Sequence, residues 1–103
     1  MRNFLKKGKI RMKEIKKEKV FQYTGKYIPE KVKRPHFFID AFKRKTLYFV
    51  GDTFMIKNNF KYIDSFLRIH EIIYVGDYIV EDKEGIVHMI RKKEFENNYK
   101  IVD

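Results

Sequence analysis

The chain contains three histidines, His36, His70 and His88, and no cysteine. Histidine is the side chain best suited to acid–base or metal chemistry near neutral pH. A metal site built on one element needs its ligands on one face, at a spacing of two on a strand or four on a helix. None of the three histidines has a second histidine at such a spacing, and neighbours such as His70 and Glu71 point to opposite faces of a strand. We therefore expect three structural histidines.

Other catalytic signatures give no stronger signal. The carboxylates are scattered, and the chain has neither a Gly-rich phosphate loop nor a Gly-x-Ser-x-Gly nucleophile motif. Without cysteine, a thiol nucleophile and a thiolate zinc site are excluded. The sequence thus predicts a protein that is not an enzyme, with no catalytic residue, no metal site and no cofactor.

The abundant chemistry is cationic. The chain has 24 Lys and Arg against 14 Asp and Glu, a net charge of +10, and most of the excess lies in residues 1–20. Clustered cations neutralise phosphates, so we expect a polyanionic partner; the alternative is a solvated basic tail that binds nothing. The residues predicted to bind nucleic acid or a partner form three clusters: Lys6, Lys7, Lys9, Arg11, Lys13, Lys16 and Lys17; Lys43, Arg44 and Lys45; and Arg91, Lys92 and Lys93.

Aromatic side chains follow two of these clusters and offer two interpretations. Tyr23 and Tyr27 come after the first cluster, and Phe95 and Tyr99 come after the third. Exposed rings would stack on unpaired bases. A chain this small also needs aromatic rings for its core. Because Phe95 and Tyr99 are four residues apart in what reads as a final helical turn, we interpret them as core anchors.

These clusters must be positioned by a small fold. We divide the chain into a basic N-terminal arm, residues 1–15, and a single globular domain, residues 16–103. Residues 17–25 alternate and read as a first strand. Residues 34–45 predict a helix, because apolar residues share one face and Pro35 suits a first helical turn. That face consists of Phe37, Phe38, Ala41 and Phe42.

Short strand signals then recur from Thr46 onward, in the order TLYFV, TFMIK, FKYI, FLRIHEIIYV, YIVED and IVHMI. Turn residues separate them, which favours an antiparallel sheet or small barrel. A competing reading places Phe60, Ile63, Leu67 and His70 at helical spacing. The tripeptide Val-Gly-Asp occurs twice, at 50–52 and 75–77, and predicts two β-corners with glycine at positive φ. We expect an α+β fold: a strongly bent, barrel-like antiparallel sheet with one packed helix.

The apolar runs are only a few residues long, so no membrane span or membrane partner is expected. The absence of cysteine fits a cytoplasmic protein.

The second Val-Gly-Asp belongs to a longer pattern in residues 74–102. Gly76-Asp77-Tyr78-Ile79-Val80, then Gly85, then Phe95-Glu96 and Tyr99 resemble the C-terminal signature of a family of small phage and prophage proteins. The segment KKEKVFQYTG resembles the opening of the same family, and the resemblance spans about residues 13–102. It implies a phage origin and a location in the host cytoplasm. It implies no catalytic residues, since the family mostly lacks an assigned role.

Together, the charge and the resemblance predict a non-enzymatic phage protein whose partner is RNA, DNA or an RNA-guided nuclease complex. The most specific version is an inhibitor of a host CRISPR-type defence. The alternatives are a phage structural or assembly accessory protein and a small nuclease or hydrolase.

Overall fold

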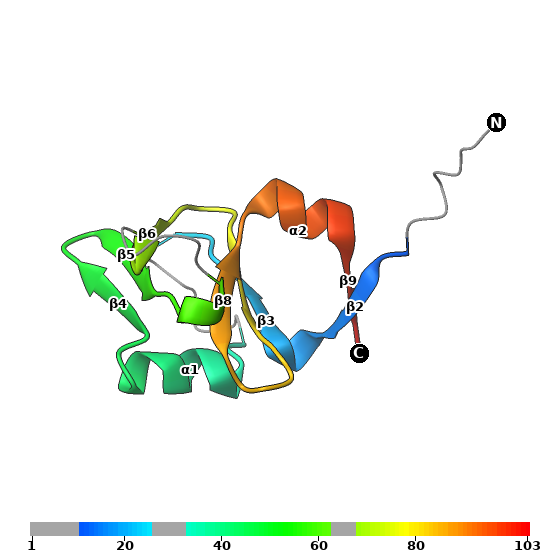
Figure 1. Ribbon diagram of the computed structural model, residues 1–103, viewed down its shortest axis with the longest axis horizontal. Helices are drawn as coiled ribbons and strands as arrows, with labels where there is room; N and C mark the ends of the chain where they lie inside the picture. The colour runs from blue at the N-terminus through cyan, green and yellow to red at the C-terminus, as the bar shows by residue number, and fades with distance from the viewer. Residues whose placement is uncertain (1–10, 26–32, 63–67) are drawn as a thin grey trace.

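The computed structural model describes residues 11–25, 33–62 and 68–103 of the chain (Figure 1). Two α-helices and eight strands lie in these ranges, which confirms the predicted α+β class. No helix within the described residues is long and apolar enough to cross a membrane. In chain order the elements are β2 (Lys13–Lys16), the 3-10 helix η2 (Lys17–Lys19), β3 (Val20–Gln22), α1 (His36–Lys43), β4 (Leu47–Val50), β5 (Thr53–Lys57), the 3-10 helix η3 (Phe60–Tyr62), β6 (His70–Ile73), β7 (Tyr78–Glu81), β8 (Val87–Ile90), α2 (Lys92–Asn98) and β9 (Tyr99–Val102).

The strands form three small sheets. β3, β7 and β8 make one antiparallel sheet, and β4, β5 and β6 make another. β2 and β9 pair in parallel, so that strands from the two ends of the described chain lie side by side (Figure 1). None of the described sheets closes into a barrel. The antiparallel strands are thus divided between two sheets.

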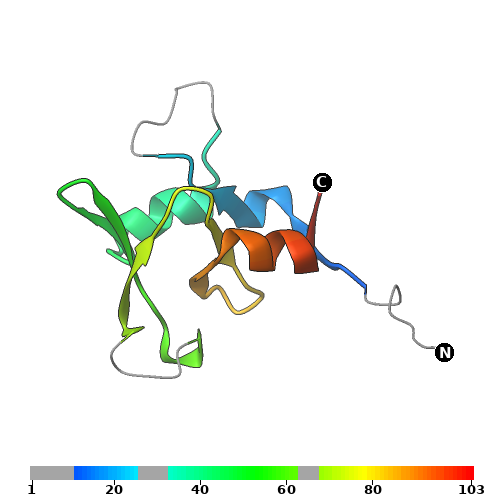
Figure 2. The ribbon, with the colours of Figure 1, turned by 90° about the horizontal axis from the view of Figure 1, so that it is seen from above.

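Helix α1 lies beside the two antiparallel sheets (Figures 1 and 2), and its buried side chains share one core cluster with theirs. Its apolar face matches the predicted helix, with Phe37, Phe38 and Ala41 buried. The Phe38 ring stacks on Phe21 of β3 at a centroid distance of 4.2 Å, and it meets Phe54 of β5 edge-on at 6.3 Å. Each such ring pair contributes about 0.5–1.5 kcal/mol beyond its buried area.

A second, smaller core lies under α2, the helix that the sequence reduced to a final turn. Phe95 is 2% exposed and stacks between Tyr78, at a centroid distance of 3.9 Å, and Tyr99, at 4.9 Å. The prediction that Phe95 anchors the core is confirmed. Ile15 of β2 packs against the same cluster, so the last residues of the predicted arm are built into a sheet.

The two Val-Gly-Asp copies both place glycine at positive φ, as predicted, but they make different connections. Gly51, at φ 60°, opens the tight hairpin between β4 and β5 in one sheet, because Val50 pairs directly with Thr53. Gly76, at φ 100°, lies where the chain leaves β6 for β7 in the other sheet. Only the second copy is a corner between sheets, so the expectation of two equivalent corners is wrong.

Two predicted strand segments begin as 3-10 helix instead. In FKYI, the side chain of Asn59 accepts a hydrogen bond from the backbone of Lys61 at 2.9 Å, and its carbonyl accepts one from Tyr62. Such local bonding by Asn favours a turn over a ladder. Lys17–Lys19 form η2 before β3 begins at Val20. The competing prediction of a helix across FKYI depends on residues 63–67, which lie outside the described residues. Tyr27 also lies outside them.

Candidate nucleic-acid interface

The first basic cluster lies only partly within the described residues. Lys6, Lys7 and Lys9 are outside them. Lys13 and Lys16 of β2 and Lys17 of η2 are exposed, as is Arg11, which precedes β2. The Lys13 ammonium lies 5.7 Å from the centre of the Tyr99 ring, and Lys17 forms a solvent-exposed ion pair with Asp103 at 3.6 Å. Solvent-exposed contacts of these two kinds are weak, so Lys13 and Lys17 both stay accessible to a phosphate or another anion that binds more strongly.

The second cluster is shaped by the C-terminus of α1. The Lys45 amide donates to the Phe42 carbonyl at 3.1 Å, and the Thr46 amide donates to the Ala41 carbonyl at 2.9 Å. This pair of hydrogen bonds defines a Schellman motif, whose C′ residue is usually glycine. Here the C′ residue is Lys45, at φ 63°, and it is the one non-glycine residue with positive φ in the described parts of the chain.

The third cluster is mostly engaged inside the protein. Arg91 donates to Asp77 at 2.5 Å, to Glu71 at 3.2 Å and to the Ile72 carbonyl at 3.1 Å. Its guanidinium also lies 5.2 Å from the centre of the Tyr74 ring. These contacts fasten the β6–β7 corner to the start of α2. They make Arg91 a structural residue in this chain.

The same corner holds the neighbours of Arg91. The Asp77 side chain is 6% exposed and accepts the backbone amides of Tyr74, at 2.8 Å, and Lys92, at 3.3 Å. Lys92 extends to an ion pair with Glu96 at 3.0 Å. Lys93 is exposed and has no ion pair among the described residues. Lys93 is therefore the member of the third cluster that is most available to a partner.

A groove of about 260 Å³ brings the second cluster together with residues distant in sequence. It lies where the end of α1, the end of β5 and the β7–β8 turn meet. Among the described residues, two cations face it and no carboxylate lines it. Its lining residues are Arg44, Thr46, Lys57, Asn58, Asn59, Gly85, Ile86 and Val87. Lys57 was not predicted from the sequence because it belongs to no run of adjacent cations; only the fold places it beside Arg44.

Carboxylates elsewhere are largely neutralised within the chain. Ion pairs within 4 Å join Asp40 to Arg44, Glu71 to Arg68 and Arg91, Asp77 to Arg91, Glu81 to Lys19, Asp82 and Glu84 to Lys61, Glu96 to Lys92, and Asp103 to Lys17. The cations with no carboxylate partner in the described parts are Arg11, Lys13, Lys16, Lys33, Lys43, Lys45, Lys57, Lys83, Lys93 and Lys100. The unneutralised charge of the described fold is therefore strongly positive.

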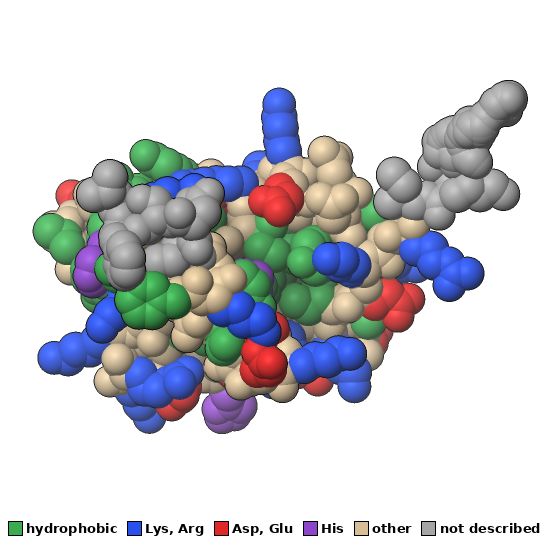
Figure 3. Space-filling model, in the orientation of Figure 1, with side chains coloured by type: hydrophobic (Ala, Val, Ile, Leu, Met, Phe, Trp, Pro, Cys, Tyr) green, Lys and Arg blue, Asp and Glu red, His purple; other side chains and the backbone are tan. Residues whose placement is uncertain are grey.

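These basic side chains are spread over the surface. On the face shown in Figure 3, Lys and Arg side chains project from several separate places around a smaller number of acidic ones. A partner that follows a path over the molecule would meet more of them than a compact ligand would.

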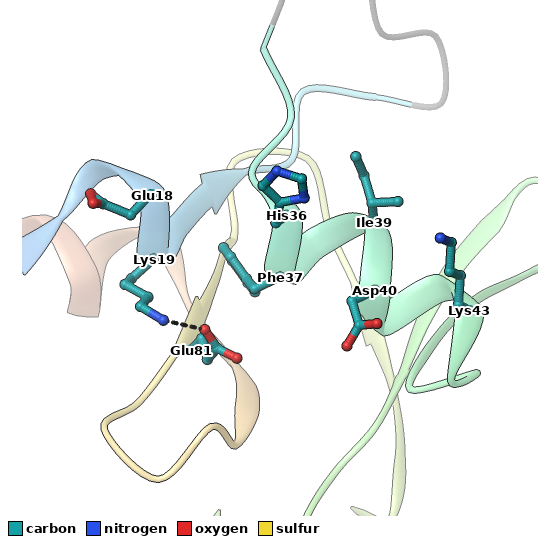
Figure 4. A pocket seen from close by; sticks show the side chains of 8 residues that line it. All are labelled: Glu18, Lys19, His36, Phe37, Ile39, Asp40, Lys43 and Glu81. Carbon is teal, nitrogen blue, oxygen red and sulfur yellow. Dashed lines mark hydrogen bonds and ion pairs between the residues drawn. The ribbon is translucent and has the colours of Figure 1, made fainter.

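A larger pocket, of about 460 Å³, lies between η2 and α1 but has mixed charge. Figure 4 shows Lys19 bonded to Glu81 on one side, with Glu18 and His36 directed away from that pair. Asp40 and Lys43 come from the next turns of α1. The charges here are opposed and do not converge, so the pocket suits neither an anion nor a proton-transfer reaction.

The histidines have different surroundings. His36 is exposed, and His70 shares a hydrogen bond of 2.6 Å with the Tyr48 hydroxyl. His88 is half-buried and stacks on Tyr62 at a centroid distance of 3.7 Å. Burial lowers the pKa of His88, since it disfavours the charged imidazolium. Within the described residues, no three His, Asp or Glu side chains are grouped so that they could hold a metal ion.

Tyr62 does not supply a base beside His88. Its hydroxyl donates to the Asp82 carboxylate, and this hydrogen bond, with burial, raises the pKa of Tyr62 to about 12. Burial raises the pKa of Asp82, but hydrogen bonds from Tyr62 and from the amides of Ile86 and Glu84 outweigh it and lower the pKa overall. The tyrosine is thus held protonated and the carboxylate ionised. This cluster fixes the β7–β8 turn.

Comparisons of the chain with protein-family models, with curated proteins and with solved structures gave no match. The class that the geometry defines is a small, basic α+β protein.

Proposed function

We propose that this chain is a non-enzymatic binding protein whose partner is RNA, DNA or a nucleoprotein. One observation carries the proposal: most described carboxylates are neutralised by internal ion pairs, whereas several cations have no such partner among the described residues. These cations include Lys57, which lines the groove, and Lys43 and Lys45, which flank the groove residue Arg44 in sequence. When unneutralised cations of a protein bind phosphates, the counterions condensed on the nucleic acid are released, and this release is the main source of affinity.

The test separates the groove from the arm. One variant replaces Lys43, Lys45 and Lys57 with Gln, and a second lacks residues 1–11. Binding of a labelled nucleic acid is titrated at several salt concentrations. We expect the slope of log K against log salt to flatten by about 0.7–0.9 for each lost phosphate contact. A control replaces Lys19 and Lys61, which already pair with Glu81 and Glu84, and it should change the slope less.

An unchanged slope in both interface variants, with unchanged affinity, would contradict the proposal. A flatter slope in the deletion variant alone would assign binding to the arm and remove the groove from the interface.

The more specific proposal is that the protein is phage-encoded and inhibits an RNA-guided defence nuclease in the host cytoplasm. The resemblance of residues 13–102 to small phage proteins supports a phage origin, and the cationic surface supports an RNA-containing target. Cleavage by a purified guide-loaded nuclease, measured with increasing amounts of the protein, tests this version. Undiminished cleavage by each nuclease type assayed, together with retained nucleic-acid binding, would reject it and leave the broader proposal standing.

A further inference from the structure

The sheet of β4, β5 and β6 has one face in the core and one face in solvent. Side chains alternate along a strand, and directly paired residues share a face. The inner face carries the buried residues Leu47, Phe54, Ile56 and Ile73, and also Phe49, which is 38% exposed, and Glu71. We use the term outer face for the opposite set, which the register places together: Tyr48, Val50, Thr53, Met55, Lys57, His70 and Ile72.

The outer face is apolar at its centre. Tyr48, Met55 and Ile72 are paired in one row across the three strands. Ile72 is 38% exposed and Val50 is 60% exposed, while Tyr48 and Met55 are half-buried. Solvated sheet faces are normally polar. Partly exposed aromatic, thioether and branched side chains in a row indicate a surface that binds something flat and apolar.

The polar groups of this face indicate what that partner is. The outer face contains Lys57 and His70 and no carboxylate. His70 is held toward Tyr48 by the hydrogen bond between the Tyr48 hydroxyl and its Nδ1. Lys57 also lines the carboxylate-free groove, so the groove and the outer face meet at this residue. A ligand with alternating anionic and planar apolar groups fits both surfaces at once.

We propose that the outer face binds the unpaired bases of a single-stranded nucleic acid whose phosphates follow the adjoining groove. This inference rests on the proposed function and narrows it to single strands. Stacked duplex bases cannot lie on a sheet, whereas unpaired bases stack on aromatic side chains in a sequence-tolerant way. A second copy of this chain fits less well, because face-to-face pairing would bring together two faces that each carry Lys57 and no carboxylate.

The chain carries its own reporters for the test. It has four methionines. Met55 lies on the outer face, Met89 packs against the core cluster, and Met12 lies beside Arg11. The full chain, labelled with ¹³C at the methionine methyl groups and assigned by Met→Leu variants, is titrated with an oligouridine strand and with an RNA duplex of equal length. We expect the Met55 methyl signal to shift with the single strand and not with the duplex, while Met89 stays unchanged.

Affinity measurements add a matched pair of variants. Ile72→Glu places a carboxylate on the outer face, and Ile39→Glu makes the same change on α1, where Ile39 is 41% exposed against 38% for Ile72. Base stacking contributes about 1–3 kcal/mol for each base. We therefore expect Ile72→Glu to weaken single-strand binding by about fivefold or more and Ile39→Glu to weaken it much less.

Each contrary outcome points to a different failure. Salt-sensitive binding of both RNAs with a silent Met55 overturns the single-strand inference and leaves the proposed function intact. No binding of either RNA overturns both. A Met55 shift that depends on protein concentration alone, with a doubled mass in sedimentation, assigns the outer face to a second copy of the chain and overturns the inference.

Discussion

Lys45 offers a test in which stability and binding should move in opposite directions. It occupies the C′ position of the Schellman motif after α1 at φ 63°, in the left-handed region. For a residue with a Cβ this conformation costs about 1–2 kcal/mol. Glycine avoids that cost but loses about 0.5–1 kcal/mol more chain entropy on folding. The Lys45→Gly variant should therefore be more stable by a net ~0.5–1 kcal/mol.

For a domain of this size, such a gain raises the melting temperature by roughly 2–8 °C. The same change removes a cation beside the groove, so the salt slope of nucleic-acid binding should flatten by about 0.7–0.9 if Lys45 contacts a phosphate. Thermal melts followed by circular dichroism and salt-dependent fluorescence anisotropy measure the two effects on the same samples.

Two matched variants separate conformation from charge. Lys45→Arg keeps both the charge and the strain, so it should behave like the natural chain in both assays. Lys45→Asn, which tolerates positive φ better than Lys, should lose binding and gain part of the stability. A Lys45→Gly variant that melts higher but binds with an unchanged slope would refute the role of Lys45 in binding. A lower melting temperature would refute the strain argument itself.

Three further predictions concern the fold. Gly76→Val should lower the free energy of unfolding by about 1–3 kcal/mol, and by more than Gly51→Val. Gly76 is at φ 100°, and an added Cβ would lie 2.9 Å from the Lys92 side chain, whereas Gly51 is at φ 60° with open space around it. Equal melting temperatures of the two variants would contradict this ranking. Asp77→Asn should destabilise the protein by about 1–3 kcal/mol in urea titrations, since Arg91 and two backbone amides would lose a charged acceptor; a midpoint like that of the natural chain would show that Asp77 is dispensable. The pKa of His88 is lower in the folded chain than in the unfolded chain. Below about pH 6.5 the unfolded chain therefore binds more protons than the folded chain, and the free energy of unfolding should decrease as pH falls from about 6.5 toward the pKa of His88 in the fold. His88→Gln should flatten that dependence, and an identical pH profile in the variant would place the titration elsewhere.

The parts of the fold that follow from local sequence were predictable. The prediction of a helix at 34–45 was correct, since α1 occupies His36–Lys43. Its apolar face, its N-terminal proline and its C-terminal cations all indicate a helix within one short segment. The strands around Gly51 and Gly85 were correct for a similar reason, since turn residues separate short β-branched and aromatic runs. Local propensity and final structure coincide in these segments.

The parts that depend on distant pairing were not predictable. β2 joins β9 in parallel across almost the whole chain, and no local pattern in a lysine-rich segment reveals its partner. The Val-Gly-Asp repeat correctly indicated positive φ at both glycines, yet the same three residues form a hairpin in one place and a crossing between sheets in the other. At the second copy, the Gly76 amide donates to the Tyr23 carbonyl and the Tyr23 amide donates to the Asp77 carbonyl, so the copy is tied to the residue that follows β3 of the other sheet. At the first copy, Val50 pairs directly with Thr53 across the hairpin.

The candidate interface shows why charge in a sequence does not locate charge on a surface. Arg91 belongs to the densest C-terminal run of cations, but Asp77 and Glu71, 14 and 20 residues earlier, hold it inside the fold. Lys57 has no cation next to it in sequence, yet the end of β5 places it in a carboxylate-free groove with Arg44. Coulomb interactions weaken with distance in space and with screening, so the carboxylates nearest in the fold decide which cations remain available. A basic run in a sequence therefore predicts a class of partner, and the ion pairs of the fold decide which of its cations are available to that partner.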